Sequence, residues 1–185
     1  VETLDLIQQH YGGDQIQLDG ESIKVSGFSG APIPGKMPPV MIGGGAKRIL
    51  GIAGEHADIV SINFNNSAGK IGPEGVGSGT SAGTSQKLEW IKAGAGGRFS
   101  EIEIEIAAYF TVITDHSDVV ANEFAKLFNL SSSEILDHPH CLIGQTSEII
   151  ERIQQRREEF GINYITFGGA AIDDVAPIVE ALSGT

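Results

Sequence analysis

The strongest candidate for ligand chemistry lies where a short apolar run meets three glycines. Residues 40–42 are followed by Gly43, Gly44 and Gly45 and then by Ala46, Lys47 and Arg48, which open a segment of helical periodicity. Glycine lets a backbone approach a ligand closely, and a helix N-terminus offers unpaired N–H groups and the positive end of its dipole to an anion. The pattern indicates a phosphate-binding turn, and the alternative is a tight strand-to-helix turn with two surface cations.

Two further candidates end other apolar runs. Asn63 and Phe64 close the run 58–64 and could contact a planar ring, although an aromatic residue there more often belongs to the core. Gly168 and Gly169 follow the run 163–167, at a strand end where barrel enzymes place ligand contacts. A tight turn is again the alternative.

A cluster of potential metal ligands lies in Asp137-His138-Pro139-His140-Cys141. Adjacent ligands on a stretch stiffened by proline rarely close a tetrahedral site, so we expect no metal and interpret the segment as a loop. Glu101, Glu103 and Glu105 alternate with isoleucines, which is typical of a strand with one solvated face. The sequence shows no nucleophile–histidine–acid arrangement, and the catalytic residues cannot be assigned.

The elements that must position these residues alternate between strand and helix. The expected strands are 40–42, 58–64, 102–112 and 163–167, and the expected helices are 46–57, 85–95, 118–128, 131–137, 146–160 and 173–182. Near-continuous apolar strands that alternate with helices predict a parallel α/β sheet. A complete (β/α)8 barrel usually has about 250 residues, so four units correspond to half of one.

The remaining segments frame this alternation. A helix over 2–11 ends at two glycines, and residues 16–28 alternate around a turn at 19–21 as in a hairpin. A proline-rich connector covers 31–39, and the Gly/Ser/Thr-rich stretch 65–84 is predicted to be a mobile surface loop. We expect residues 1–185 to form a single domain.

Charge and composition exclude several classes of partner. Asp and Glu outnumber Lys and Arg by 24 to 12, which gives a net charge of −12, so we expect no nucleic-acid partner. The longest apolar run is far too short to span a membrane, and one cysteine, Cys141, agrees with a cytoplasmic protein. The start at Val1 has the character of an internal segment.

The chain resembles the luciferase-like monooxygenase superfamily, and within it the oxidoreductases that use the deazaflavin coenzyme F-420. The likeness lies in residues 2–7, 18–21, 38–50, 57–60, 90–99, 142–144 and 161–167, in the order that the family has them. The resemblance implies a (β/α)8 barrel of which this chain supplies strands five to eight, the C-terminal half. It also implies that Gly43 to Arg48 contact the cofactor phosphate at the C-terminal mouth of the barrel.

The implied activity is hydride transfer between coenzyme F-420 and an organic small-molecule substrate. An FMN-dependent monooxygenase of the same superfamily is the alternative within enzymes, because a phosphate turn suits either cofactor. A non-catalytic half barrel is the third possibility. Half a barrel leaves two strand edges unpaired, so we expect a homo-oligomer or a missing N-terminal half as partner.

Overall fold

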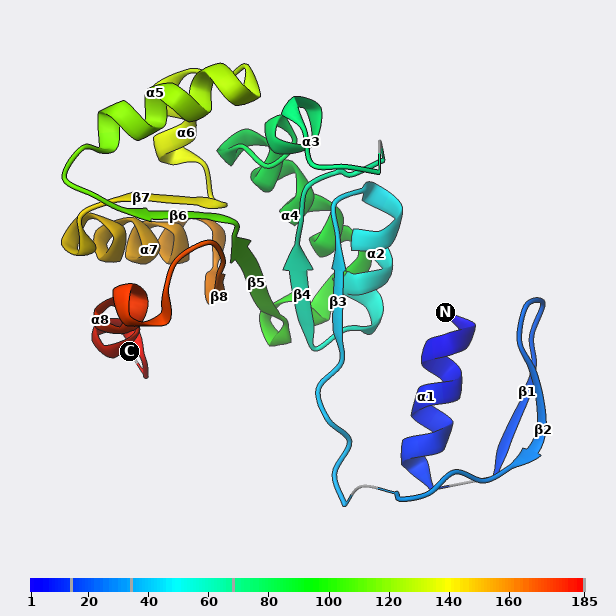
Figure 1. Cartoon of the computed structure of the whole chain (residues 1–185). Helices are drawn as coiled ribbons and strands as arrows, with labels where there is room; N and C mark the ends of the chain where they lie inside the picture. The colour runs from blue at the N-terminus through cyan, green and yellow to red at the C-terminus, as the bar shows by residue number, and fades with distance from the viewer. Residues whose placement is uncertain (14, 34, 68, 185) are drawn as a thin grey trace. The chain divides into compact units, whose positions relative to one another are not determined.

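The computed structural model describes residues 1–13, 15–33, 35–67 and 69–184, which form two compact units. The first unit is Val1–Val40 and the second is Met41–Thr185 (Figure 1). The sequence predicts one domain, and the division falls at the end of the proline-rich connector. Proline removes backbone donors there, as is common in connectors between compact units.

The first unit is a helix with a hairpin. Helix α1 (Glu2–Gly12) precedes strands β1 (Ile16–Asp19) and β2 (Lys24–Phe28), which pair antiparallel. The predicted helix and hairpin are confirmed. The hairpin turn is tied to the start of α1, because the Glu2 carboxylate accepts hydrogen bonds from the backbone N–H groups of residues 21, 22 and 23 at 2.7, 3.0 and 2.9 Å. These bonds lower the pKa of Glu2.

The second unit is built on parallel strands. The strands β3 (Met41–Gly44), β4 (Ile59–Ile62), β5 (Glu103–Ala108) and β8 (Ile162–Phe167) form a sheet in the order β3-β4-β5-β8, all parallel. This confirms the predicted α/β class and the four strands. The predicted run 102–112 is divided at Tyr109, after which β6 (Phe110–Ile113) pairs in parallel with β7 (Cys141–Gly144). Residues 141–144, which the sequence predicts to follow a loop, are therefore a buried strand.

Five described helices of this unit begin within one residue of the predicted start, a sixth begins four residues early, and two short ones are not predicted. In chain order, the helices are α2 (Lys47–His56), α3 (Pro73–Gly77), α4 (Ser81–Ala95), the 3₁₀ helix η1 (Gly96–Glu101), α5 (Ser117–Phe128), α6 (Ser132–Asp137), α7 (Thr146–Phe160) and α8 (Ile172–Leu182). Capping boxes mark the starts of two of them. Gln145 and Glu148 form the capping box of α7, and Ser131 and Glu134 form that of α6.

Part of the segment 65–84, predicted to be a loop, is helical. Residues 73–77 form α3, and α4 begins at Ser81 because the Thr80 hydroxyl accepts a hydrogen bond from the backbone of Gly83. Val76 and Thr84 are fully buried. Local composition misses these helices because a distant residue holds them: His138 Nε2 lies 2.9 Å from the Val76 carbonyl oxygen.

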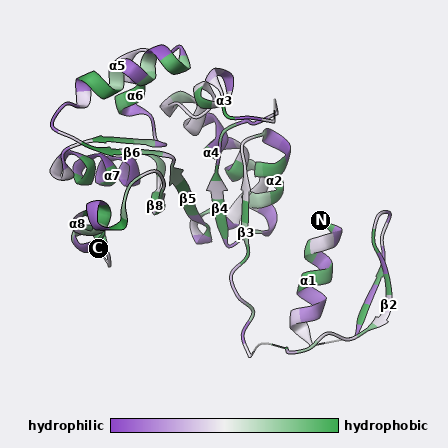
Figure 2. Ribbon diagram, viewed as in Figure 1, coloured by the Kyte–Doolittle hydropathy of each residue, from purple (hydrophilic) through white to green (hydrophobic). Residues whose placement is uncertain are grey.

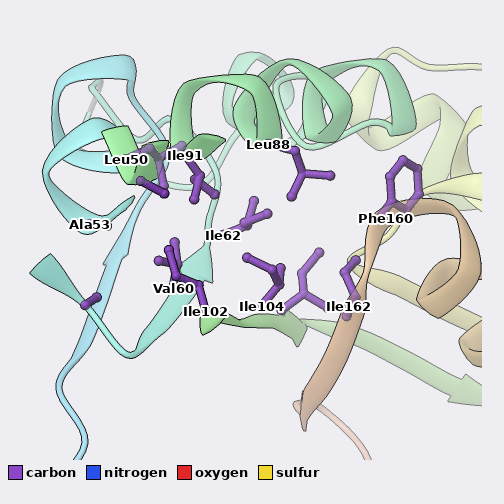
Figure 3. Packing of buried hydrophobic residues seen from close by; sticks show 13 residues of the cluster. Leu50, Ala53, Val60, Ile62, Leu88, Ile91, Ile102, Ile104, Phe160 and Ile162 are labelled. Carbon is purple, nitrogen blue, oxygen red and sulfur yellow. The ribbon is translucent and has the colours of Figure 1, made fainter. Parts of the chain in front are cut away.

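The main core lies between the four-stranded sheet and the helices α2 and α4 (Figures 1 and 3). Leu50 from α2 and Ile91 from α4 point toward Val60, Ile62 and Ile104 on the strands (Figure 3). Hydrophilic and hydrophobic residues share each of these helices, as amphipathic packing requires (Figure 2).

The two helices approach each other closely through glycine. A Cβ on Gly94 would lie 2.1 Å from the Gly51 carbonyl oxygen, and one on Gly54 would lie 2.3 Å from that of Ile91. Side chains at either position would therefore force α2 and α4 apart.

The β6–β7 pair lies between two further helical layers. Cys141 and Ile143 face a cluster with α5 and α6, whereas Leu142 faces α7 and α8. Among the described residues, no helix is long and apolar enough to cross a membrane.

Candidate functional site

The strand register brings polar residues together on one face of the sheet. Gly43, Ser61, Glu105 and Tyr164 pair across the four strands and form one row. Side chains alternate along a strand, and Ile104 and Ile106 pack in the core beneath α4. The row therefore lies on the opposite face, which we call the inner face. Because the strands are parallel, Asn63, Ala107 and Thr166 follow at their C-terminal ends.

Asn63 is fixed from three directions at this edge. Its side-chain oxygen accepts a hydrogen bond from the Tyr109 hydroxyl at 2.5 Å, and its Nδ2 donates to the Ser61 hydroxyl at 3.1 Å. Its backbone N–H donates to the Gly44 carbonyl at 2.9 Å. The predicted site residue Asn63 thus links β3, β4 and β5 at the C-terminal edge of the sheet.

A buried lysine donates a hydrogen bond to the backbone of Asn63. Lys87 of α4 is 2% exposed, and its Nζ donates to the Asn63 carbonyl oxygen at 2.7 Å. Burial lowers the pKa of Lys87 to about 8. Burial also raises the pKa of Tyr109, and the nearby negative charge of Glu105 raises it further. The Tyr109 hydroxyl therefore stays protonated and donates to Asn63 at neutral pH.

Glu105 is the residue whose environment the sequence predicts wrongly. The alternation with isoleucines predicts a solvated carboxylate, but Glu105 is 3% exposed because β5 has a neighbouring strand on each side. Its Oε2 is buried without a hydrogen-bond partner among the described residues. Burial of a carboxylate oxygen that has no hydrogen-bond partner costs on the order of several kcal/mol of stability. Packing alone therefore does not explain a glutamate at this position.

An aromatic and histidine cluster lies beneath the same edge. Phe64 is 2% exposed, and its ring centroid lies 4.4 Å from that of His140 and 5.1 Å from that of Tyr109. The structure thus places Phe64 in the core beside the site. The cluster also contains His138, whose ring centroid lies 5.6 Å from that of His140.

Both histidines are neutral and held by backbone groups. Burial lowers the pKa of His138 to about 4 and that of His140 to about 3. His140 Nδ1 lies 2.8 Å from the Ala107 carbonyl oxygen, so Nδ1 carries the proton and Nε2 is an acceptor, buried without a partner among the described residues. The backbone N–H of His140 donates to His138 Nδ1 at 3.2 Å. Sequence reasoning treated these histidines as loop residues, although two imidazoles just before a buried apolar run were a usable indication.

Two arginines of α7 hold the histidine segment in place. Arg156 is 5% exposed and donates to the carbonyl oxygens of residues 138, 139 and 141 at 2.9, 3.1 and 2.9 Å. Arg152, one helical turn earlier, donates to the Ile143 carbonyl at 2.9 Å. Burial lowers the pKa of Arg156 to about 10. A guanidinium can serve several acceptors at once, which explains arginine here.

The glycine turn after β3 has one side packed against the protein and one side exposed. A Cβ on Gly44 would lie 2.3 Å from the Ile49 side chain, and one on Gly45 would lie 2.1 Å from the Phe64 carbonyl oxygen. These two glycines are thus required by the fold. The turn still has an open side, which consists of Gly43, Ala46, Lys47 and Arg48, all exposed.

The open side of this turn is the N-terminus of α2. Ala46 is the N-cap residue, no described side chain caps the helix, and its first turn contains no acidic residue. Free N–H groups, the helix dipole and the charges of Lys47 and Arg48 together suit an anion.

The second glycine turn lies at the other side of the sheet. Gly168 donates to the Ala108 carbonyl at 2.9 Å, and Gly169 has a φ of 79°, a left-handed conformation that favours glycine. β3 and β8 are separated by two strands, so the two turns are roughly 14 Å apart at ordinary strand spacing. The structure therefore does not bring the two glycine turns into contact, although they share the C-terminal edge.

Two further features of this unit are the segment of potential metal ligands and a cavity beside β8. Among the described residues, no group of three or more His, Cys, Asp or Glu could hold a metal ion. Within the segment 137–141, burial raises the pKa of the Cys141 thiol to about 12, which keeps it protonated. A cavity of about 280 Å³ opens between β8 and the helices α7 and α8, where Tyr164, Phe167 and Val179 line it.

The comparisons with known proteins identify the fold. No family model matches the chain, and no curated protein matches it significantly. Solved structures match nearly the whole chain. One is an F420-dependent secondary alcohol dehydrogenase in complex with an F420-acetone adduct, with a TM-score of 0.65 at 16% identity over 98% of this chain. Another is the coenzyme F420 dependent tetrahydromethanopterin reductase from Methanopyrus kandleri, with a TM-score of 0.68 at 16% identity over 96% of this chain.

Monooxygenases share the fold as well. A long-chain alkane monooxygenase has a TM-score of 0.58 at 16% identity over 90% of this chain, and the match covers 45% of the monooxygenase. The EDTA monooxygenase from Chelativorans sp. BNC1 has a TM-score of 0.59 at 12% identity over 91% of this chain, and 51% of its own length is covered. The chain covers 59% and 60% of the dehydrogenase and the reductase. The chain thus shares its fold with these F420-dependent enzymes and monooxygenases, and it spans 45% to 60% of their length.

Proposed function

We propose that this chain forms the phosphate side of the cofactor site of a flavin-type oxidoreductase. The observation that carries the proposal is the uncapped N-terminus of α2, with exposed Gly43, Ala46, Lys47 and Arg48, at the C-terminal edge of a parallel sheet. In α/β folds this edge is where ligands bind. The donors there fit a phosphate group, because the first turn of the helix carries two cations and uncapped backbone N–H groups and contains no carboxylate.

Coenzyme F-420 is our first candidate for the cofactor. The two structures with TM-scores of 0.65 and 0.68 are F420-dependent enzymes by their names. FMN is the second candidate, because the fold is shared by monooxygenases and a phosphate turn does not distinguish the two cofactors. We infer hydride transfer with an organic substrate for the first cofactor and monooxygenation for the second.

In this proposal each residue of the site has a role. Lys47, Arg48 and the first N–H groups of α2 bind the phosphate and set the position of the cofactor. Asn63 and Tyr109, fixed by their mutual hydrogen bond, form a rigid polar edge where the rest of the cofactor would lie. Gly168 and Gly169 allow close approach from the β8 side. The cofactor supplies the redox chemistry, and the protein supplies position and electrostatics.

We further propose that the four-stranded sheet is strands five to eight of a barrel that other strands complete. β3 and β8 each pair with one neighbour only among the described strands. The inner face exposes Met41 at 47% and Tyr164 at 39%, and free strand edges and apolar side chains favour association. Light scattering with intact mass tests this: a complex with a second copy or a further segment supports it, and a stable monomer of this chain alone contradicts it.

An absorbance titration tests the cofactor. The purified chain, in its assembled form, is titrated with coenzyme F-420 and with FMN, and the shift of the chromophore band is followed. Saturable binding of F-420 in preference to FMN supports the first candidate. The reverse preference supports the monooxygenase alternative, and binding of neither refutes the proposed site.

A further inference from the structure

Glu105 is a buried acidic residue of the inner strand β5. Its Oε2 has no hydrogen-bond partner among the described residues, and no Lys, Arg or His nitrogen of those residues forms an ion pair with it. Glu105 raises the pKa of Tyr109, whose hydroxyl donates its hydrogen bond to Asn63. An acceptor that is 3% exposed and unpaired lowers stability, so its presence points to a partner outside the chain.

Small side chains surround this carboxylate on the inner face. Gly43 and Ser61 precede it along the row, and Ala107 follows it two residues later on β5. Gly43 is exposed and Ala107 is partly exposed. These residues are small, whereas the bulkier Tyr164 lies on the far side of the row in β8.

Glu105 lies within reach of a ligand anchored at the glycine turn. It is two strands from Gly43, roughly 10 Å at ordinary strand spacing. A ligand whose phosphate binds the start of α2 would extend its ribityl chain or its ring across β4 toward β5. Both of these groups carry hydrogen-bond donors, namely hydroxyls on the chain and an imide N–H on the ring.

We propose that Glu105 is a binding residue that accepts a hydrogen bond from an N–H or O–H group of the cofactor. The inference rests on the proposed function and adds a specificity determinant to it. A carboxylate accepts only, so it selects a cofactor that presents a donor at this position and disfavours one that presents a carbonyl. Tyr109, held by Asn63, stands at the mouth above it and does not compete for the carboxylate.

The test compares Glu105→Gln and Glu105→Leu with the control Glu103→Gln. Glu103 lies two residues earlier on the same strand and face but is partly exposed, so it matches in chemistry and differs in burial. Fluorescence titrations with F-420 and FMN are expected to show about tenfold to hundredfold weaker binding for Glu105→Gln, more for Glu105→Leu, and no change for Glu103→Gln.

Two further probes identify the donor. Lumiflavin has the ring without the ribityl chain, and N3-methyl-lumiflavin also lacks the imide N–H. A loss of affinity in Glu105→Gln for lumiflavin but not for its methyl derivative assigns the ring as donor. A loss for FMN alone assigns the ribityl hydroxyls.

Thermal unfolding of the unliganded protein gives a readout that does not depend on the cofactor. Both Glu105 variants are expected to raise the midpoint by about 2–8 °C, because they remove an unpaired buried charge. A lower midpoint would show a structural partner and overturn the inference. If wild type and both variants bind the cofactor with equal affinity, the inference about Glu105 is wrong but the proposed function stands. If wild type binds neither flavin nor deazaflavin, the proposed function is wrong as well.

Discussion

The buried histidines make the fold sensitive to acid. The pKa values of His138 and His140 fall from 6.5 to about 4 and about 3 on folding. Between pH 6.5 and those values the unfolded chain binds protons that the folded protein does not bind. Stability is therefore complete above pH 6.5 and is lost as the pH falls. At pH 4.5 each histidine costs roughly 2.5 kcal/mol, about 5 kcal/mol together, a large fraction of the stability of a domain.

A double variant isolates this effect from the carboxylates. In His138→Gln/His140→Asn, the Gln amide nitrogen replaces Nε2 and the Asn amide nitrogen replaces Nδ1, so the bonds to the carbonyls of Val76 and Ala107 are kept without a titrating group. Urea unfolding at pH 7 and pH 4.5 is the assay. Wild type is expected to lose about 5 kcal/mol more than the variant over this interval. Equal losses would show that the histidines are not buried in the neutral form.

Four further substitutions test the packing around the site. Arg156→Met removes the guanidinium that donates to three buried carbonyl oxygens, of which that of His138 keeps one other donor, the Cys141 N–H. The free energy of unfolding in urea is expected to fall by about 3 kcal/mol, and a loss below about 1 kcal/mol would contradict the assigned contacts. Folding lowers the pKa of Lys87 from 10.5 to about 8. The free energy of unfolding of the wild type, measured in urea, should therefore rise relative to that of Lys87→Met as the pH increases from 8 to 10.5. A difference between the two proteins that does not change with pH would argue against burial of the lysine. Gly45→Ala should cost about 1–3 kcal/mol because its Cβ meets the Phe64 carbonyl, whereas Gly51→Ala, with open space at its Cβ, should stabilise α2 by up to about 1 kcal/mol. Similar thermal shifts for the two alanines would refute the close approach.

Local periodicity accounts for most of what the sequence predicts correctly. The alternation of apolar strands with helices is sufficient to predict the parallel sheet, and the helices predicted to start at 131 and 146 begin within one residue of those positions. The break of the long strand at Tyr109 could not be predicted in this way. It depends on β6 leaving the sheet to pair with β7, a contact between distant segments.

The candidate site is only partly visible in the sequence. The glycine turn at Gly43 and the residue Asn63 are local patterns, and both lie at the C-terminal edge of the sheet. The burial of Glu105 and the pairing of Lys87 with Asn63 depend on which strand is central and on how α4 crosses it. Neither is encoded in nearby residues, and for that reason a solvated glutamate was predicted where a buried one lies.

The central claim is that the turn at the start of α2 binds a phosphate group. FMN and riboflavin differ only by that phosphate, so the ratio of their affinities isolates its contribution. We predict that wild type binds FMN at least about tenfold more tightly than riboflavin, as a charge-assisted contact should give. The ratio should fall close to one in Lys47→Ala/Arg48→Ala and stay unchanged in the control Lys126→Ala, on the exposed face of α5. A ratio that is the same in wild type and the double variant would contradict the claim.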